Sequence, residues 1–144
     1  MKAPVVLDAE GLSALAEDRP PNRLRLILDE AHRQQRDVLV PAVVCAEVCR
    51  GIERTRAVEA AISRAGRPHG RSPVVIVETD FELARQVGAI LHATRSGTED
   101  LVDAHVVAAC ISHGGGLVVT SDPDDIARLA SASPGTRVVT RPAR

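Results

Sequence analysis

The most constraining feature of the sequence is a series of short aliphatic segments separated by longer segments with helical periodicity. We predict that each of the short segments is a strand. The predicted strands are Pro4–Leu7, Val38–Val40, Val74–Val77, Leu117–Val119 and Val138–Val139. Short buried strands that alternate with helices imply a mostly parallel sheet covered on both faces. The sequence therefore predicts an α/β fold with a mostly parallel central sheet flanked by helices.

The segments between the predicted strands have apolar residues at helical spacing. Residues Arg23–Gln35 and Phe81–Ala93 each place four apolar side chains on one face, which predicts two amphipathic helices. Residues Ala42–Gly51 predict another helix. Residues Asp100–His113 are almost entirely apolar after the first turn and are followed by three glycines, which permit a left-handed helix end. We expect this last helix to be central and buried.

Length and composition limit the class of protein. The 144 residues leave room for one core, and we predict a single domain over residues 1–144. The hydrophobic fraction of 44% is almost entirely aliphatic, because Phe81 is the only aromatic residue. Such a composition is typical of a globular chain. The first apolar run is too short for a signal peptide, and no segment approaches roughly 18 consecutive apolar residues. We expect a soluble, cytoplasmic protein with no membrane partner.

The cysteines and the overall charge are less informative. Cys45, Cys49 and Cys110 cannot all pair with one another, and the zinc-binding CxxC spacing is absent. We predict buried free thiols. The net charge of −1 does not indicate a nucleic-acid partner. Six arginines do lie between residues 50 and 71, either as a basic flap or as a solvated helix face followed by a loop.

Four acidic residues stand out by their positions. Asp8 and Asp122 directly follow the first and fourth predicted strands, where parallel sheets bind ligands, although Asp there also caps the next helix. Glu47 and Asp103 lie among apolar residues of predicted helices, where a buried carboxylate without a partner is unfavourable. If these acids converge, a divalent cation would compensate their repulsion. Ligation by oxygen alone favours magnesium or manganese over zinc.

The ordered set of acids resembles the four acidic positions of PIN domains. The matching residues are Asp8, Glu47, Asp103 and Asp122, within the local sequences Val-Leu-Asp, Ala-Glu-Val-Cys-Arg-Gly, Val-Asp-Ala-His-Val-Val-Ala and Thr-Ser-Asp. The resemblance extends from residue 5 to about residue 139, and the small size is similar to that of VapC-type toxins. It implies a PIN-like three-layer sandwich.

The resemblance also implies an activity. A protein of this family would be a metal-dependent endoribonuclease, a hydrolase that leaves 5′-phosphate and 3′-hydroxyl ends. The implied catalytic and metal-binding residues are Asp8, Glu47, Asp103 and Asp122, with Mg²⁺ or Mn²⁺ as the cofactor. Asp100 and Asp125 would lie beside these ligands or on the substrate side, and Ser121 would orient a carboxylate or a metal-bound water. The sequence leaves open which of Asp122, Asp124 and Asp125 faces the metal.

Partners follow from the same resemblance. It implies an RNA substrate, a cognate antitoxin protein that docks beside the acids, and a homodimer. The candidate phosphate contacts are Arg50, Arg54, Arg67 and Arg71. Base stacking on aromatic side chains contributes little in a chain with one phenylalanine.

Two other functions remain open. The five histidines permit a metal-free ribonuclease with a general acid and base, of which His105 lies nearest to the acids; its product would be a cyclic phosphate. Alternatively, the chain is a non-catalytic PIN-like binding module. A phospho-acceptor signalling module would need a lysine late in the chain, and Lys2 is the only lysine. A P-loop nucleotide site would need a Gly-Lys-Ser/Thr element, which is missing.

Overall fold

The computed structural model describes residues 2–65 and 74–144, which contain a single sheet of parallel strands. The strands are β1 (Val5–Leu7), β2 (Val38–Pro41), β3 (Val74–Val77), β4 (Gly116–Val119) and β5 (Val138–Arg141). Their order across the sheet is β3-β2-β1-β4-β5, and every neighbouring pair is parallel. All five predicted strands are confirmed. The sheet is wholly parallel, because a helical connection separates each strand from the next.

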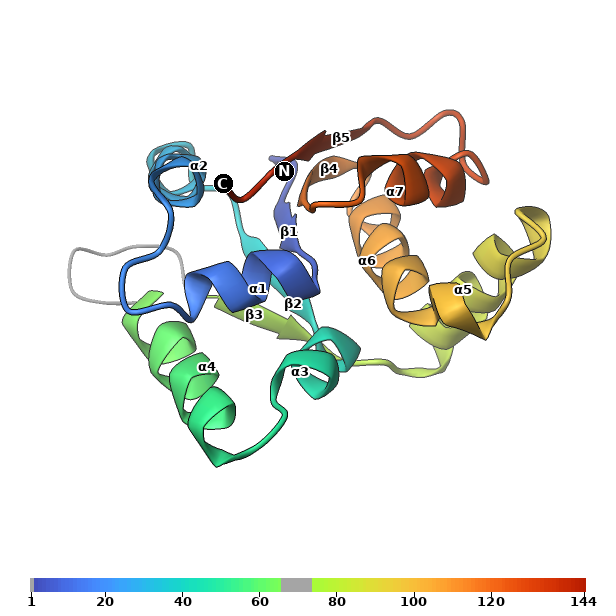
Figure 1. The fold of residues 1–144 in the computed structure, drawn as a ribbon. Coiled ribbons are helices and arrows are strands. Elements are labelled where there is room, and N and C mark those ends of the chain that lie inside the picture. Colours follow the sequence, from blue (N-terminus) through green and yellow to red (C-terminus); the bar gives the residue numbers. More distant parts are fainter. Residues whose placement is uncertain (1, 66–73) are drawn as a thin grey trace.

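Helices cover both faces of this sheet. They are α1 (Ala9–Leu15), α2 (Asn22–Arg33), α3 (Ala42–Val48), α4 (Ile52–Ala65), α5 (Phe81–Ala93), α6 (Leu101–Ser112) and α7 (Pro123–Ala130). Helices α1 to α4 lie on one side of the strands and α5 to α7 on the other (Figure 1). This is the predicted α/β three-layer arrangement. None of the helices in the described part of the chain is both long and apolar enough to cross a membrane.

Helix α6 forms the centre of one layer. Residues 104–110 are all buried, and the helix contacts β1, β2 and β4 as well as α5 and α7. The helix ends before Gly114 and Gly115, whose φ angles of 83° and 114° are accessible mainly to glycine. The prediction of a central, buried helix that stops at the glycines is confirmed. Its start differs slightly, because Asp100 belongs to a preceding 3₁₀ turn, Thr98–Asp100.

The helix expected at Ala42–Gly51 is shorter than predicted. It ends at Val48, and the chain then turns through Gly51, which has a φ of 93°, into α4. The short α3 buries only Val44 and Val48 on its inner face. Consequently Cys45 and Cys49 are half-buried, and only Cys110 is fully buried as predicted. All three thiols are free, and burial raises the pKa of Cys110 to about 11.

A candidate metal centre at the carboxyl end of the sheet

Strands β1 and β4 end side by side in the middle of the sheet. Leu7 pairs with Val119, so Asp8 and Thr120 follow the two strands at equivalent positions. From β1 the chain continues to β2 on one side, whereas β4 is followed by β5 on the other. The strand order therefore reverses between β1 and β4. In open parallel sheets, ligands bind at the carboxyl ends of the strands beside this switch point.

Asp8 is both a helix cap and a member of the acidic cluster. One carboxylate oxygen accepts a hydrogen bond from the backbone N–H of Gly11 at 2.9 Å, which caps α1. The residue is only 6% exposed, and this burial raises its pKa, while hydrogen bonds from the Thr120 hydroxyl and from Gly11 lower it. The charge of Asp8 also raises the pKa of Asp103. Asp8 therefore interacts with the acidic cluster in addition to capping α1.

Asp103 is the point at which the acids meet. It lies in the first turn of α6 and is half-buried. Burial is the main cause that raises its pKa to about 6, and the negative charges of Asp8, Asp125, Asp122 and Glu47 add to the effect. Four carboxylates, from the starts of α1 and α7 and from α3, are thus close enough to Asp103 to disfavour its ionised form.

Glu47 and Asp122 approach this centre from the solvent side. The sequence suggested a buried Glu47, but the structure places it on the exposed side of α3, because Val44 and Val48 occupy the buried face. Asp122 stands at the N-cap position of α7, yet its side chain makes no capping hydrogen bond. Helix capping therefore does not account for the Asp122 carboxylate. Both side chains are exposed and can adjust to a ligand.

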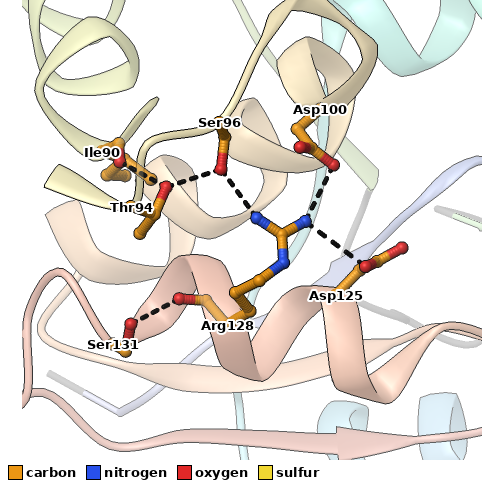
Figure 2. A network of polar contacts seen from close by, with 7 residues as sticks. All are labelled: Ile90, Thr94, Ser96, Asp100, Asp125, Arg128 and Ser131. Carbon is orange, nitrogen blue, oxygen red and sulfur yellow. Dashed lines mark hydrogen bonds and ion pairs between the residues drawn. The ribbon is translucent and has the colours of Figure 1, made fainter. Parts of the chain in front are cut away.

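The tightest group of acids differs from the predicted quartet. Within the described residues, carboxylate oxygens that lie within 4.8 Å of one another belong to Asp100, Asp103 and Asp125. Only Asp103 is common to both sets. The difference has a cause in Arg128, whose guanidinium bonds to Asp100 at 3.0 Å and to Asp125 at 3.3 Å (Figure 2). A shared cation brings these two carboxylates together, whereas no ion pair within the described residues involves Asp8, Glu47 or Asp122.

Thr120 and Arg128 were given no role by sequence reasoning. Thr120 is 2% exposed; its Oγ1 accepts from the backbone N–H of Asp122 at 2.9 Å and it also hydrogen-bonds to Asp8. It thus occupies the orienting position that the sequence assigned to Ser121, which is exposed. The spacing of Asp125 and Arg128, three residues apart on one helix face, was a usable signal for their ion pair. No local pattern indicated Asp100 as the second partner.

His105 has a structural hydrogen bond. Its Nδ1 lies 2.8 Å from the carbonyl oxygen of Leu101, one helical turn earlier, and must carry the proton because a carbonyl only accepts. The ring is 5% exposed, and its Nε2 has no hydrogen-bond partner among the described residues. Such burial leaves the best-placed histidine poorly accessible to an RNA substrate.

The candidate RNA contacts are only partly described. Arg50 and Arg54 are both exposed, Arg50 in the turn before α4 and Arg54 in its first turn, and Arg54 reaches Ser13 of α1 at 3.4 Å. Arg67 and Arg71 lie outside the described residues. The donors available at the centre itself are carboxylate oxygens, which suit Mg²⁺ or Mn²⁺ rather than zinc.

Comparisons with known proteins agree with the fold. The chain is similar in fold to "Structure of FitAB bound to IR36 DNA fragment" (TM-score 0.61, 19% identity, 96% of this chain and 94% of the other). It also resembles FitAcB from Neisseria gonorrhoeae (TM-score 0.60, 18% identity, 94% of this chain and 96% of the other). A third similar structure is VapBC2 from Rickettsia felis bound to a promoter DNA fragment (TM-score 0.63, 14% identity, 94% of this chain and 97% of the other). No curated protein sequence matches significantly. The PIN domain family model matches residues 5–132, and the chain therefore belongs to the PIN-domain family.

Proposed function

We propose that this chain is a metal-dependent endoribonuclease and the toxin component of a VapBC-type toxin–antitoxin pair, acting in the cytoplasm. The observation that carries the nuclease assignment is the convergence of carboxylates around Asp103 at the switch point of the sheet. PIN domains are generally nucleases that use a divalent metal, and membership of the family supports the same chemistry here. The fold likeness to FitAB and VapBC2 supports the toxin assignment.

The proposed metal ligands are the acids at the ends of β1 and β4 and on α3 and α6. They are Asp8, Glu47, Asp103 and Asp122. A divalent cation held by these residues would lower the pKa of a bound water and offset the charge of the scissile phosphate. Asp8 is held in place by Thr120 and Gly11 before any ligand arrives. Asp103 would bind the cation in its ionised form, and the exposed Glu47 and Asp122 would complete the set.

RNA is proposed to approach the exposed side of this cluster. Arg50 and Arg54 are exposed and are not engaged in ion pairs within the described residues, so their guanidinium groups can contact phosphates. Such contacts position the backbone and do not read the sequence. The proposed products have 5′-phosphate and 3′-hydroxyl ends.

A second protein is proposed to regulate the site. The names FitAB and VapBC2 denote assemblies related in fold to this chain, which supports a cognate antitoxin as the partner. A homodimer is proposed by the same analogy. Large apolar side chains that are exposed and available for such contacts include Leu26, Ile52 and Phe81.

The test is cleavage of total cellular RNA by the purified protein with Mn²⁺, with Mg²⁺ and with EDTA, followed by analysis of the fragment ends. We expect metal-dependent cuts bearing 5′-phosphates that fall to background in Asp8→Asn and in Asp103→Asn. Glu82→Gln is the matched control, because Glu82 is an exposed acid that pairs with Arg85 on α5.

The other outcomes point to the other functions. Cutting that survives EDTA and leaves cyclic phosphates would favour the histidine mechanism. Absence of cutting in a protein that still binds Mn²⁺ would favour a binding module. Full activity in both Asn variants would exclude the acidic cluster as the catalytic centre.

A further inference from the structure

Arg128 places a positive charge beside the acidic cluster. Its Nη2 contacts one oxygen each of Asp100 and Asp125, at 3.0 and 3.3 Å, and the side chain of Asp100 is only 14% exposed. These are two of the three residues whose carboxylate oxygens gather within 4.8 Å, the third being Asp103. Figure 2 shows the guanidinium between the two carboxylates, with its other terminal nitrogen turned to Ser96. One side of the acidic cluster therefore already holds a positive charge.

The guanidinium is held by a hydrogen-bond chain with a fixed direction. Thr94 Oγ1 lies 2.8 Å from the carbonyl oxygen of Ile90, so the hydroxyl proton of Thr94 is donated there. Ser96 Oγ is 2.7 Å from Thr94 Oγ1 and must be the donor of that pair. The Ser96 oxygen is then left as an acceptor, and Arg128 Nη1 donates to it at 2.7 Å. The end of α5 thus anchors an arginine of α7 (Figure 2).

The other side of the cluster has no such cation. Within the described residues, no ion pair involves Asp8, Glu47 or Asp122. Paired metal ions in phosphodiester-cleaving sites stand about 3.5 to 4 Å apart. Asp103 belongs to the group with Asp100 and Asp125 and is also close enough to Asp8 and Asp122 for their charges to raise its pKa. A metal ion on the Asp100 side would have to displace the guanidinium or stand against its charge.

We propose that Arg128 replaces the second cation, so that this protein binds one divalent ion, on the side of Asp103 that faces Asp8. The proposal rests on the proposed function, since it concerns the same acids. It assigns Arg128 as a positioning residue: the guanidinium neutralises Asp100 and Asp125, and it leaves the remaining carboxylates to the metal. Removal of the guanidinium should open a second site formed by Asp100, Asp103 and Asp125.

The test counts bound Mn²⁺ ions on the full-length protein, by titration with electron paramagnetic resonance detection of free Mn²⁺. We expect one ion in the wild type and two in Arg128→Gln. The matched control is Arg85→Gln, which removes another exposed arginine from an i,i+3 ion pair, on α5, and should leave the count at one. The double variant Arg128→Gln with Asp100→Asn should return the count to one. Arg128→Met serves the same purpose should the Gln variant not fold.

Either of two results would overturn the inference: two ions in the wild type, or a single ion in a folded Arg128→Gln or Arg128→Met protein. The number of bound ions is measured without RNA. Either of these wrong numbers would therefore overturn this inference without bearing on the proposed nuclease activity. Failure of the nuclease would appear as a wild type that cuts no RNA with any metal. A wild type that binds no Mn²⁺ would overturn both.

Discussion

At the scale of single residues, burial and mutual repulsion make the ionised carboxylates of the acidic centre unfavourable in the metal-free protein. Asp8 and Asp103 both have a raised pKa, in each case mainly because burial removes the carboxylate from water. A side chain retained in such a setting favours folding only when its charge is neutralised, by a proton or by a cation. The two residues thus lower stability where they are ionised and unliganded.

Replacement of Asp103 by Asn should stabilise the metal-free protein at pH 7. The folded-state pKa of about 6 lies above the ordinary 3.8, so the folded state holds the proton more tightly than the unfolded state does. That contribution to stability is complete below about pH 4 and is lost as the pH rises through 6. Because Asp103 is only half-buried, we expect a gain of roughly 1 kcal/mol after allowance for solvent screening.

Urea unfolding in EDTA at pH 4 and pH 7 measures this difference. The free energy of unfolding of Asp103→Asn should exceed that of the wild type at pH 7, and the two values should lie closer together at pH 4. A variant less stable than the wild type at pH 7 would show that the Asp103 carboxylate makes favourable contacts that outweigh its burial.

At the scale of elements, the site depends on how the segments after β1 and β4 begin. Helix α1 has only seven residues, and the Asp8 carboxylate satisfies one of its unpaired N–H groups. After β4, Thr120 connects the backbone of Asp122 to the Asp8 carboxylate. The Asp8 carboxylate and the Thr120 hydroxyl therefore cap α1 and connect the ends of β1 and β4, and Thr120 orients the proposed metal ligand Asp8.

A pair of substitutions at Asp8 should separate these roles. Asn retains an oxygen for the Gly11 N–H, whereas Ala does not, so Asp8→Ala should be about 1 kcal/mol less stable than Asp8→Asn. Both should lose Mn²⁺ binding, because neither keeps the charge. Chemical unfolding and a Mn²⁺ titration of the two variants measure the effects; equal stability would mean that the cap contributes nothing to the fold.

At the scale of the whole molecule, metal binding and folding should be linked through protons. A ligand that binds only the folded state at 100 times its Kd adds about 2.7 kcal/mol of stability. Because Asp103 must lose a proton first, the apparent Mn²⁺ affinity should fall about tenfold for each pH unit below 6 and change less above it. Thermal melts with and without Mn²⁺ at pH 5 and pH 7 test this link: the increase in Tm should be larger at pH 7 and absent in Asp103→Asn. An equal increase at both pH values would contradict it.

The sequence by itself was sufficient for features that depend on neighbours along the chain. The strands, the full extent of α5, the buried α6 and the positions of Asp8 and Asp122 after their strands all follow from periodicity, turn residues and strand order. These patterns are local, and a parallel α/β sheet brings strand ends to one edge whatever the details of packing. The choice of acids to inspect could therefore be made from the sequence.

Only the tertiary structure decided how these acids are paired. Asp100 and Arg128 are separated by 28 positions, and their contact depends on the packing of α7 against α6. The same packing determines that Thr120 rather than Ser121 is buried beside Asp8 and that Glu47 is exposed. The pKa of Asp103 likewise depends on four charges from distant segments. Electrostatic energies vary with distance and burial, and neither quantity is encoded in the spacing of residues along the chain.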